Sequence, residues 1–243
     1  MLADDKALST EPAVTEMSGA EIANGATQSS EPTNQAGALL HASRRVDWRF
    51  LLPEPILKDV LCVQPVSQTL AEALQIFSAS LASLEPGALG DERQPHLYDV
   101  VVALDPSKAT LSRMATLVKP GGYIYLEAHG LTSLLRSSQR AARAGGVAGA
   151  VRQRGPWLPK AYKDALQALD FSEPQSHWHW PDFENCKMMI PLESPAAVQH
   201  AFHRGGHGLK TRLRTGLGQV LLRSGLLAWT VPCFSVLARR EVL

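Results

Sequence analysis

The side chains with the clearest capacity for chemistry lie in one alternating stretch, His177–Trp178–His179–Trp180. In an extended strand successive side chains point to opposite faces, so the two histidines would share one face and the two tryptophans the other. Histidine is suited to proton transfer near neutral pH, which makes His179 the first candidate for a general base beside an aromatic wall. The alternative, which base rates favour, is an edge strand with one packed face and one solvated face.

Three further histidines, His200, His203 and His207, are close together in the sequence. His200 and His203 are one helical turn apart, but Gly205–Gly206 is expected to end that helix before His207. No cysteine or acidic residue is spaced to complete a zinc shell around them. We therefore predict no metal site.

Basic side chains gather in two glycine-containing stretches, 136–154 and 210–214. Their members are Arg136, Arg140, Arg143, Arg152 and Arg154 in the first, and Lys210, Arg212 and Arg214 in the second. Arginine forks bind phosphate well, so a phosphorylated small-molecule substrate is one hypothesis, and a solvated basic surface is the default. Nucleic-acid binding is disfavoured, because aromatic residues are sparse there and no nucleic-acid module is recognisable.

Three apolar runs predict the strands that would position these side chains: Asp59–Gln64, Asp99–Leu104 and Tyr123–Glu127. Helical spacing follows the first run, with Ser67 as the expected N-cap, and follows the second over Lys108–Val118. Strands that alternate with helices in this way form parallel sheets. We therefore expect an α/β domain.

The remaining elements are less regular. Ala79–Glu85 is either a second strand or the tail of the preceding helix. Beyond the third run we expect a mobile basic excursion over Gly130–Gly155, helices over Leu158–Leu169 and Pro195–Arg204, and extended segments at Gln175–Trp180, Cys186–Leu192 and Phe234–Arg239.

The N-terminal segment Met1–Ala42 has a different composition from the rest of the chain. It carries six acidic residues and one basic residue and no aromatic side chain, whereas the remainder is mildly basic. Such a segment cannot bury enough apolar surface to offset the loss of chain entropy on ordering. We predict a disordered acidic tail over 1–42 and one folded domain over 43–243.

The composition, 45% apolar and 19% charged over 243 residues, is typical of a soluble globular protein with one good-sized domain. Cys62, Cys186 and Cys233 are far apart and form no Cys-x-x-Cys motif. This spacing argues against a disulfide framework and favours a reducing, cytoplasmic location. No apolar run is long enough to span a bilayer, and no signal peptide is evident.

The segment Tyr98–Val102, followed at a helix's distance by Leu117–Glu127, resembles the pattern of the class I S-adenosylmethionine-dependent methyltransferases. In that family a strand beginning Phe/Tyr-Asp-Val-Val leads to a helix, then to Leu-Lys-Pro-Gly-Gly and the fifth strand. Pro120 cannot continue a helix, and Gly121–Gly122 allows a sharp turn into the sheet. Weaker similarities at Asp47–Pro53, Ala165–Phe171 and Phe234–Arg239 extend the resemblance over roughly residues 44–240.

The resemblance implies a Rossmann-like α/β fold, with a mostly parallel sheet and helices on both faces. It also implies transfer of a methyl group from S-adenosylmethionine to a small-molecule or cell-envelope or secondary-metabolite acceptor, with His179 or His129 as the base. Glu85 would be the acidic residue that accepts hydrogen bonds from the cofactor's ribose, or else an exposed turn residue. Asp105 lies where ligands bind in open α/β sheets, although it also suits a turn or helix cap.

Two departures from the family pattern support a different hypothesis. The stretch Cys62–Thr69, where the family has a glycine-rich cofactor loop, contains no glycine, and Pro65 and Val66 hinder close approach of the backbone. Gln64 and Ser67 would have to replace the lost backbone amides with side-chain contacts. The interval between Glu85 and Tyr98 is also too short for a full βα unit, so one unit is missing or compressed. The alternative function is therefore a catalytically inactive methyltransferase-like scaffold or partner subunit.

Overall fold

The computed structural model describes residues 31–89, 97–133, 158–203 and 226–242, together with residues 216, 218, 220, 221 and 224. The chain divides into two compact units, Met1–Ala38 and Leu39–Leu243, a few residues before the predicted boundary. Residues 1–30 of the predicted tail lie outside the described part. Helix α1 covers Glu31–Arg45, so order begins before the expected start near Arg44. Pro32 lies in the first turn of this helix, where proline is tolerated, and Arg44 and Arg45 lie in its last turn, where cations interact favourably with the helix dipole.

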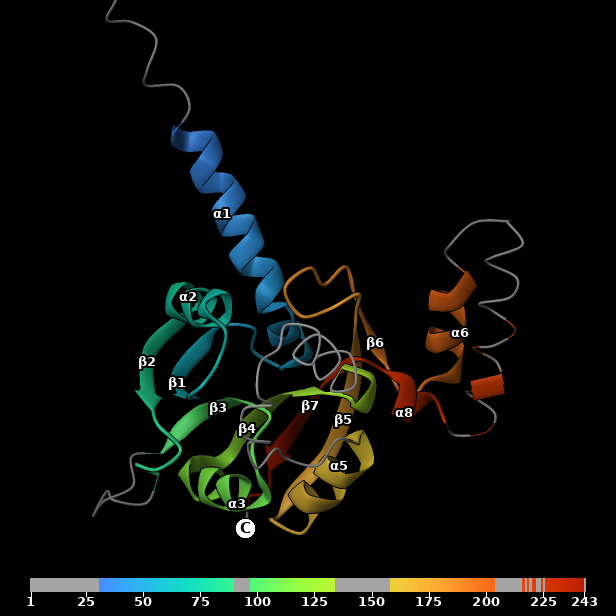
Figure 1. Cartoon of the computed structure of the whole chain (residues 1–243). Helices are drawn as coiled ribbons and strands as arrows, with labels where there is room; N and C mark the ends of the chain where they lie inside the picture. Colours follow the sequence, from blue (N-terminus) through green and yellow to red (C-terminus); the bar gives the residue numbers. More distant parts are fainter. Residues whose placement is uncertain are drawn as a thin grey trace, which may run out of the picture. The chain divides into compact units, whose positions relative to one another are not determined.

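The folded unit is built on a sheet whose seven described strands have the order β2-β1-β3-β4-β7-β5-β6 (Figure 1). The strands are β1 Leu57–Val63, β2 Ser78–Leu84, β3 Tyr98–Leu104, β4 Val118–His129, β5 Phe171–Trp180, β6 Met188–Pro191 and β7 Cys233–Arg240. Strands β2, β1, β3 and β4 are mutually parallel, and β7 is antiparallel to both β4 and β5. The predicted mostly parallel α/β sheet is confirmed.

The described helices that follow α1 are η1 Asp47–Leu51, α2 Gln68–Phe77, α3 Lys108–Leu117, α5 Pro159–Gln167, α6 Pro195–His203 and α8 Leu227–Thr230. Helices α2, α3 and α6 begin after a serine whose hydroxyl accepts a backbone N–H of the first turn. The Ser67 hydroxyl accepts the Leu70 N–H at the start of α2, as predicted, and the Ser107 hydroxyl accepts the Thr110 N–H at the start of α3. Each cap satisfies a backbone donor that has no partner within the helix.

Both faces of the sheet are buried, which explains why its strands are continuous apolar runs. Along β1, Val60 and Cys62 face the core shared with η1 and α2, whereas Leu61 and Val63 face the core shared with α3 and α5. This alternation follows from the two-residue period of a strand. The expected helices on both faces are therefore present.

The segment Ala79–Glu85, which the sequence left open between strand and helix, forms strand β2 at one edge of the sheet (Figure 1). The next described strand, β3, pairs with β1 on the opposite side. No strand in the described residues pairs with the outer side of β2. This agrees with the predicted loss of one βα unit.

The expected edge position of the His177–Trp180 stretch is wrong, because strand β5 lies between β7 and β6. The side chains of His177, Trp178 and His179 are all buried, so neither face of this strand is solvated there. The sequence showed the alternation correctly but could not show that a further short strand, β6, covers the outer side.

The predicted glycine turn after α3 is required by close backbone packing. Gly121 has a φ of 77°, a conformation that is costly for residues with a Cβ atom. A Cβ atom at Gly122 would lie 2.9 Å from the carbonyl oxygens of Asp99 and Lys119. The Lys119 ammonium lies 2.9 Å from carboxylate oxygens of both Asp59 and Asp99, which ties the amino ends of β1, β3 and β4 together.

No helix in the described part of the chain has the length and apolar character needed to cross a membrane.

Candidate functional site

The carboxyl ends of β1, β2, β3 and β4 enclose a cavity of about 630 Å³, which we call the strand-end cavity. Its lining residues are Val63, Gln64, Pro65, Glu85, Pro86, Ala103, Leu104, Asp105, Pro106, Ser107, Thr110, His129 and Ser133. Ligands of open α/β sheets bind at this edge, and the volume lies within the range of small-molecule sites. The structure thus brings together four of the six predicted site residues: Gln64, Glu85, Asp105 and His129.

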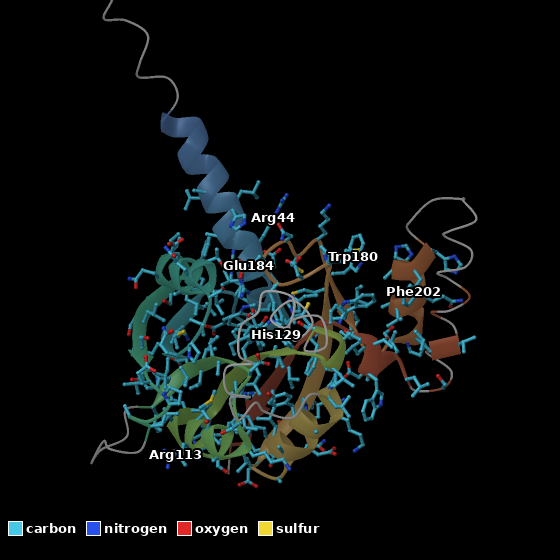
Figure 2. All side chains as sticks on the ribbon, in the orientation of Figure 1. Arg44, Arg113, His129, Trp180, Glu184 and Phe202 are labelled. Carbon is cyan, nitrogen blue, oxygen red and sulfur yellow. The ribbon has the colours of Figure 1, made fainter. Side chains whose placement is uncertain are left out.

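Asp105 and His129 form a hydrogen-bonded pair at the cavity wall (Figure 2 labels His129). One carboxylate oxygen of Asp105 accepts the His129 backbone N–H at 2.8 Å, and the other lies 2.8 Å from the ring Nδ1. Asp105 has a φ of 47°, and its own N–H donates to the carbonyl of Glu127 at 2.8 Å. Strained backbone of this kind persists only where the surroundings hold it. Ser107, not Asp105, caps α3, so the helix-cap interpretation of Asp105 is wrong.

Glu85 follows the last residue of β2 and lines the same cavity. It is exposed, and its carbonyl accepts the Ala88 N–H, as expected for a turn residue, whereas its role toward a ribose stays a prediction. A carboxylate at this position can accept two hydrogen bonds from neighbouring hydroxyl groups. The geometry therefore fits the ribose of a nucleoside cofactor.

The loop after β1 uses its polar groups internally. The Gln64 N–H donates to the Leu84 carbonyl at 2.9 Å, and the Val66 N–H donates to the Gln64 side-chain oxygen at 3.1 Å. The Gln64 side-chain nitrogen donates to the Ser83 hydroxyl at 3.0 Å, and Pro65 has no N–H. These groups cannot also serve the charged amino-acid end of S-adenosylmethionine without breaking contacts.

Ser67 does not line the cavity, because its hydroxyl caps α2 and contacts Thr69 at 3.1 Å. Its predicted role as a replacement for a lost backbone amide has no geometric support among the described residues. Glu85 and Asp105 line the cavity, whereas the polar groups of the loop after β1 are bonded within the protein.

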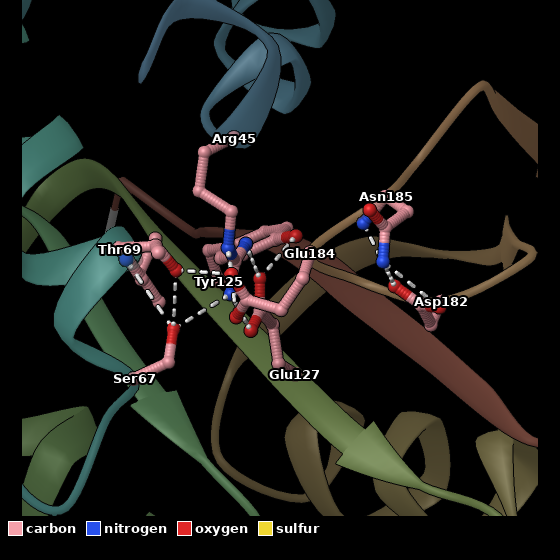
Figure 3. Close-up of polar contacts among 9 residues, drawn as sticks. Arg45, Ser67, Thr69, Tyr125, Glu127, Asp182, Glu184 and Asn185 are labelled. Atoms are coloured by element: carbon pink, nitrogen blue, oxygen red, sulfur yellow. Dashed lines mark hydrogen bonds and ion pairs between the residues drawn. The ribbon is translucent and has the colours of Figure 1, made fainter. Parts of the chain in front are cut away.

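A second set of interacting polar side chains lies at the C-terminal end of α1, around Arg45 (Figure 3). Two guanidinium nitrogens of Arg45 donate to the two carboxylate oxygens of Glu127, at 2.5 and 2.6 Å. The side chains are 2% and 1% exposed, and the Tyr125 hydroxyl donates to the same carboxylate at 3.2 Å. Glu184 lies 3.6 Å from the Arg45 Nε, and Ser67 lies 3.5 Å from its Nη2. We call these residues the buried ion-pair cluster.

Burial and the charge of Glu127 have opposing effects on the pKa of Arg45 but act in the same direction on the pKa of Tyr125. Burial alone lowers the pKa of Arg45, but the hydrogen bond and charge of Glu127 outweigh it and raise the pKa above its usual range. Burial, followed by the Glu127 charge, raises the pKa of Tyr125. One feature of the sequence could have indicated Glu127, because it is a carboxylate near the end of an otherwise apolar strand. Nothing in the sequence indicated Arg45.

His179, the first candidate base, lies away from the lining of the cavity. Its ring is 3% exposed and its Nε2 is 2.8 Å from the Ser235 hydroxyl. Burial, helped by the charges of Arg45 and His177, lowers the pKa of His179 to about 3. The ring of Phe183 separates the two histidines, with centroids 4.8 Å from His179 and 5.8 Å from His129. The base role of His179 stays a prediction, and its surroundings suit a neutral packing residue.

The remaining predicted features are the histidines at 200, 203 and 207 and the two basic stretches, and most of them lie outside the described residues. His200 and His203 lie on α6, while His207 and the basic stretches 136–154 and 210–214 fall outside the described residues. Within the part that is described, no group of three or more histidine, cysteine or acidic side chains could hold a metal ion.

No family model and no curated protein matches the chain. Solved methyltransferase structures do match. A SAM-dependent methyltransferase of Thermotoga maritima, described as a possible histamine N-methyltransferase, is 12% identical with a TM-score of 0.45, over 87% of this chain and 95% of that one. One from Archaeoglobus fulgidus is 13% identical with a TM-score of 0.46, over 82% and 94%.

A third match is a phosphoethanolamine N-methyltransferase of Haemonchus contortus with S-adenosyl-L-methionine bound. It is 11% identical with a TM-score of 0.39, over 84% of this chain and 56% of that one. Sequence identities and TM-scores this low carry no argument about the substrate or the activity of this chain. The fold assignment rests on the strand order and on the Tyr98–Glu127 pattern.

Proposed function

We propose, from the class I (Rossmann-like) methyltransferase fold of this chain, that its strand-end cavity binds S-adenosylmethionine for methyl transfer to a small-molecule acceptor. The observation that carries the proposal is the Asp105–His129 pair in the wall of a cavity that also presents Glu85. S-adenosylmethionine, when bound, supplies an electrophilic methyl group on a sulfonium. All other steps belong to side chains of this protein.

Glu85 is proposed to hold the cofactor's ribose. Its carboxylate is exposed at the end of β2 and lines the cavity, so hydroxyl groups can donate to both oxygens. Hydrogen bonds to a charged group each contribute about 1.5–3 kcal/mol. Loss of the charge is therefore expected to weaken nucleoside binding by about tenfold or more.

His129 is proposed to remove the proton from the acceptor oxygen or nitrogen. Asp105 holds Nδ1 at 2.8 Å, which fixes the ring and directs proton exchange to Nε2. The Asp105 carboxylate then stabilises the imidazolium that forms. General-base catalysis of this kind contributes about 10²–10⁴-fold in rate.

The acceptor class is part of the proposal. Ser107, Thr110 and Ser133 line the same cavity, and the hydroxyls of Ser107 and Thr110 contact each other at 2.8 Å, so a small molecule with polar groups is the acceptor we propose. A phosphorylated acceptor is supported only by the basic composition of 136–154. The free cysteines Cys62, Cys186 and Cys233 fit the cytoplasmic location that the proposal assumes.

The test is calorimetric titration of the purified full-length chain with S-adenosylhomocysteine. We expect saturable binding to the wild type and binding at least tenfold weaker for Glu85→Gln. The matched control is Glu173→Gln, which changes a carboxylate outside the cavity lining. Well-folded protein that does not bind would overturn the proposal. If binding is found, His129→Asn should bind equally well but lose about 100-fold or more in methyl transfer.

The internally bonded loop after β1 supports a second candidate, a catalytically inactive methyltransferase-like subunit. Its polar groups, described above, are engaged with Leu84, Ser83 and one another. On this account 5′-methylthioadenosine, which lacks the amino-acid end, should bind within about threefold of S-adenosylhomocysteine, because the missing end makes little contact. A much larger preference for S-adenosylhomocysteine would favour the enzyme. Equal binding without detectable methyl transfer would favour the inactive subunit.

A further inference from the structure

Strand β2 lies at one edge of the sheet, and no strand of the described residues pairs with its outer side (Figure 1). The Gln64 N–H donates to the Leu84 carbonyl, so the backbone polar groups of Leu84 face the β1 side. Consecutive residues of a strand turn these groups to opposite sides. The N–H and C=O groups of Ala79, Leu81 and Ser83 therefore point outward, and they make no hydrogen bond within the described part of the chain.

The composition of this edge does nothing to prevent pairing. Natural sheet edges are usually protected by charged residues, prolines or bulges. Ser78–Leu84 reads Ser-Ala-Ser-Leu-Ala-Ser-Leu and has no charged residue and no proline, and its pairing with β1 shows no register shift. Ala79, Ser80 and Ser83 are exposed. The edge is therefore open along most of its length.

The outward groups are self-complementary about one point. In an antiparallel pair with a twofold axis at Leu81, Leu81 lies opposite its own copy and Ala79 lies opposite Ser83. Each of these residues turns both polar groups outward, so each opposed pair exchanges two hydrogen bonds. We propose that the β2 edge is a dimer interface, in which two copies of this chain join their sheets through antiparallel β2 strands centred on Leu81.

Charge and apolar exposure at the ends of the strand agree with this register. The axis at Leu81 places Glu85 of one copy opposite Phe77 of the other. The Arg49 guanidinium lies 4.2 Å from the centroid of the Phe77 ring, so a cation lies beside the position that faces Glu85. Ile76 and Phe50 are 50% and 62% exposed beside this ring. Apolar surface there would be covered in the dimer, which adds area that strand pairing alone does not provide.

A twofold interface also explains why a small uncharged strand is suitable. In a symmetric interface every residue near the axis meets a copy of itself or of a close neighbour. A charged residue at position 81 would therefore face a like charge across the axis. The leucine observed there avoids this repulsion.

The first test is the solution mass of the full-length chain by light scattering. We expect the wild type to have twice the chain mass of 26.3 kDa. Leu81→Pro should be monomeric, because proline removes an outward N–H and leaves the bonds to β1 intact. Leu81→Val keeps that N–H and should remain dimeric. A monomeric wild type, or a folded Leu81→Pro that is still dimeric, would overturn the proposal.

The second test is cross-linking, which does not depend on how well the proline variant folds. Opposed residues of a hydrogen-bonded pair have Cα atoms about 5.5 Å apart, which suits a disulfide. Leu81→Cys should therefore give a covalent dimer on mild oxidation, whereas Ser80→Cys, which does not face its own copy, should not. Cys62 and Cys233 are buried, and a Cys186→Ser background removes the third thiol. Equal cross-linking of both variants, or none, would contradict the register.

Discussion

The strand-end cavity and the buried ion-pair cluster lie near the same carboxyl edge of the sheet but offer very different chemistry. Each contains a carboxylate near the end of a strand, Asp105 after β3 and Glu127 within β4. The Asp105 side chain is partly exposed and holds His129, whereas Glu127 is 1% exposed and holds Arg45. Access to the cavity, rather than residue type, decides which carboxylate can take part in a reaction.

The two histidines at this edge show the same contrast. His129 lines the cavity, and its ring is held by a carboxylate. His179 is buried against a hydroxyl group, and its pKa is lowered to about 3, so it stays neutral at physiological pH. Phe183 contacts both rings. One aromatic side chain therefore contacts both a histidine that lines the cavity and a buried, neutral one.

The largest expected effect is on the buried ion-pair cluster. Arg45→Ala should lower the free energy of unfolding by about 3–5 kcal/mol, because Glu127 would remain buried without its cation. Urea denaturation followed by circular dichroism measures the change. Lys160→Ala is the matched control, since the exposed Lys160–Asp164 pair should contribute less than about 1 kcal/mol. Equal losses in both variants would show that the cluster is not sealed from solvent.

A smaller loss in the free energy of unfolding is expected when the pH falls, because His179 is buried in its neutral form. The unfolded chain binds a proton at His179 near pH 6.5, but the folded chain does so only near pH 3. Stability conferred by the neutral ring is therefore complete above pH 6.5 and falls below it, by up to about 1.4 kcal/mol per pH unit. Urea titrations between pH 7 and pH 5 should show this slope in the wild type and a shallower one in His179→Gln. Identical slopes would mean that His179 is solvated.

The smallest effect on stability is expected in the cavity. Asp105→Asn should change the free energy of unfolding by less than about 1 kcal/mol, because the pair with His129 is partly exposed and asparagine tolerates a positive φ. Its proposed function should suffer more, with methyl transfer falling about 100-fold or more. A thermal melt and a transfer assay on the same preparation compare the two. A large loss of stability would place Asp105 with the structural residues instead.

Much of the fold could be predicted because the information is local. The runs at Asp59–Gln64 and Asp99–Leu104, the Ser67 cap and the Gly121–Gly122 turn each depend on neighbours in the chain, and each appears as expected. The prediction that one βα unit is missing or compressed also agrees with the described strands, because the short interval between Glu85 and Tyr98 limits the reach of the chain. The β5 edge assignment failed because the pairing of β6 is a long-range event.

The sequence by itself determined an α/β domain with a methyltransferase-like centre and an altered cofactor loop. It also pointed to Asp105, because ligands of open α/β sheets bind at the ends of the strands, and the resemblance pointed to Glu85 and to His129 as a possible base. Only the tertiary structure decided that His179 is buried, that Ser67 serves a helix, and that Arg45 reaches Glu127 across 82 positions of the chain. Burial and partner choice depend on what packs over a side chain, and no local pattern records that.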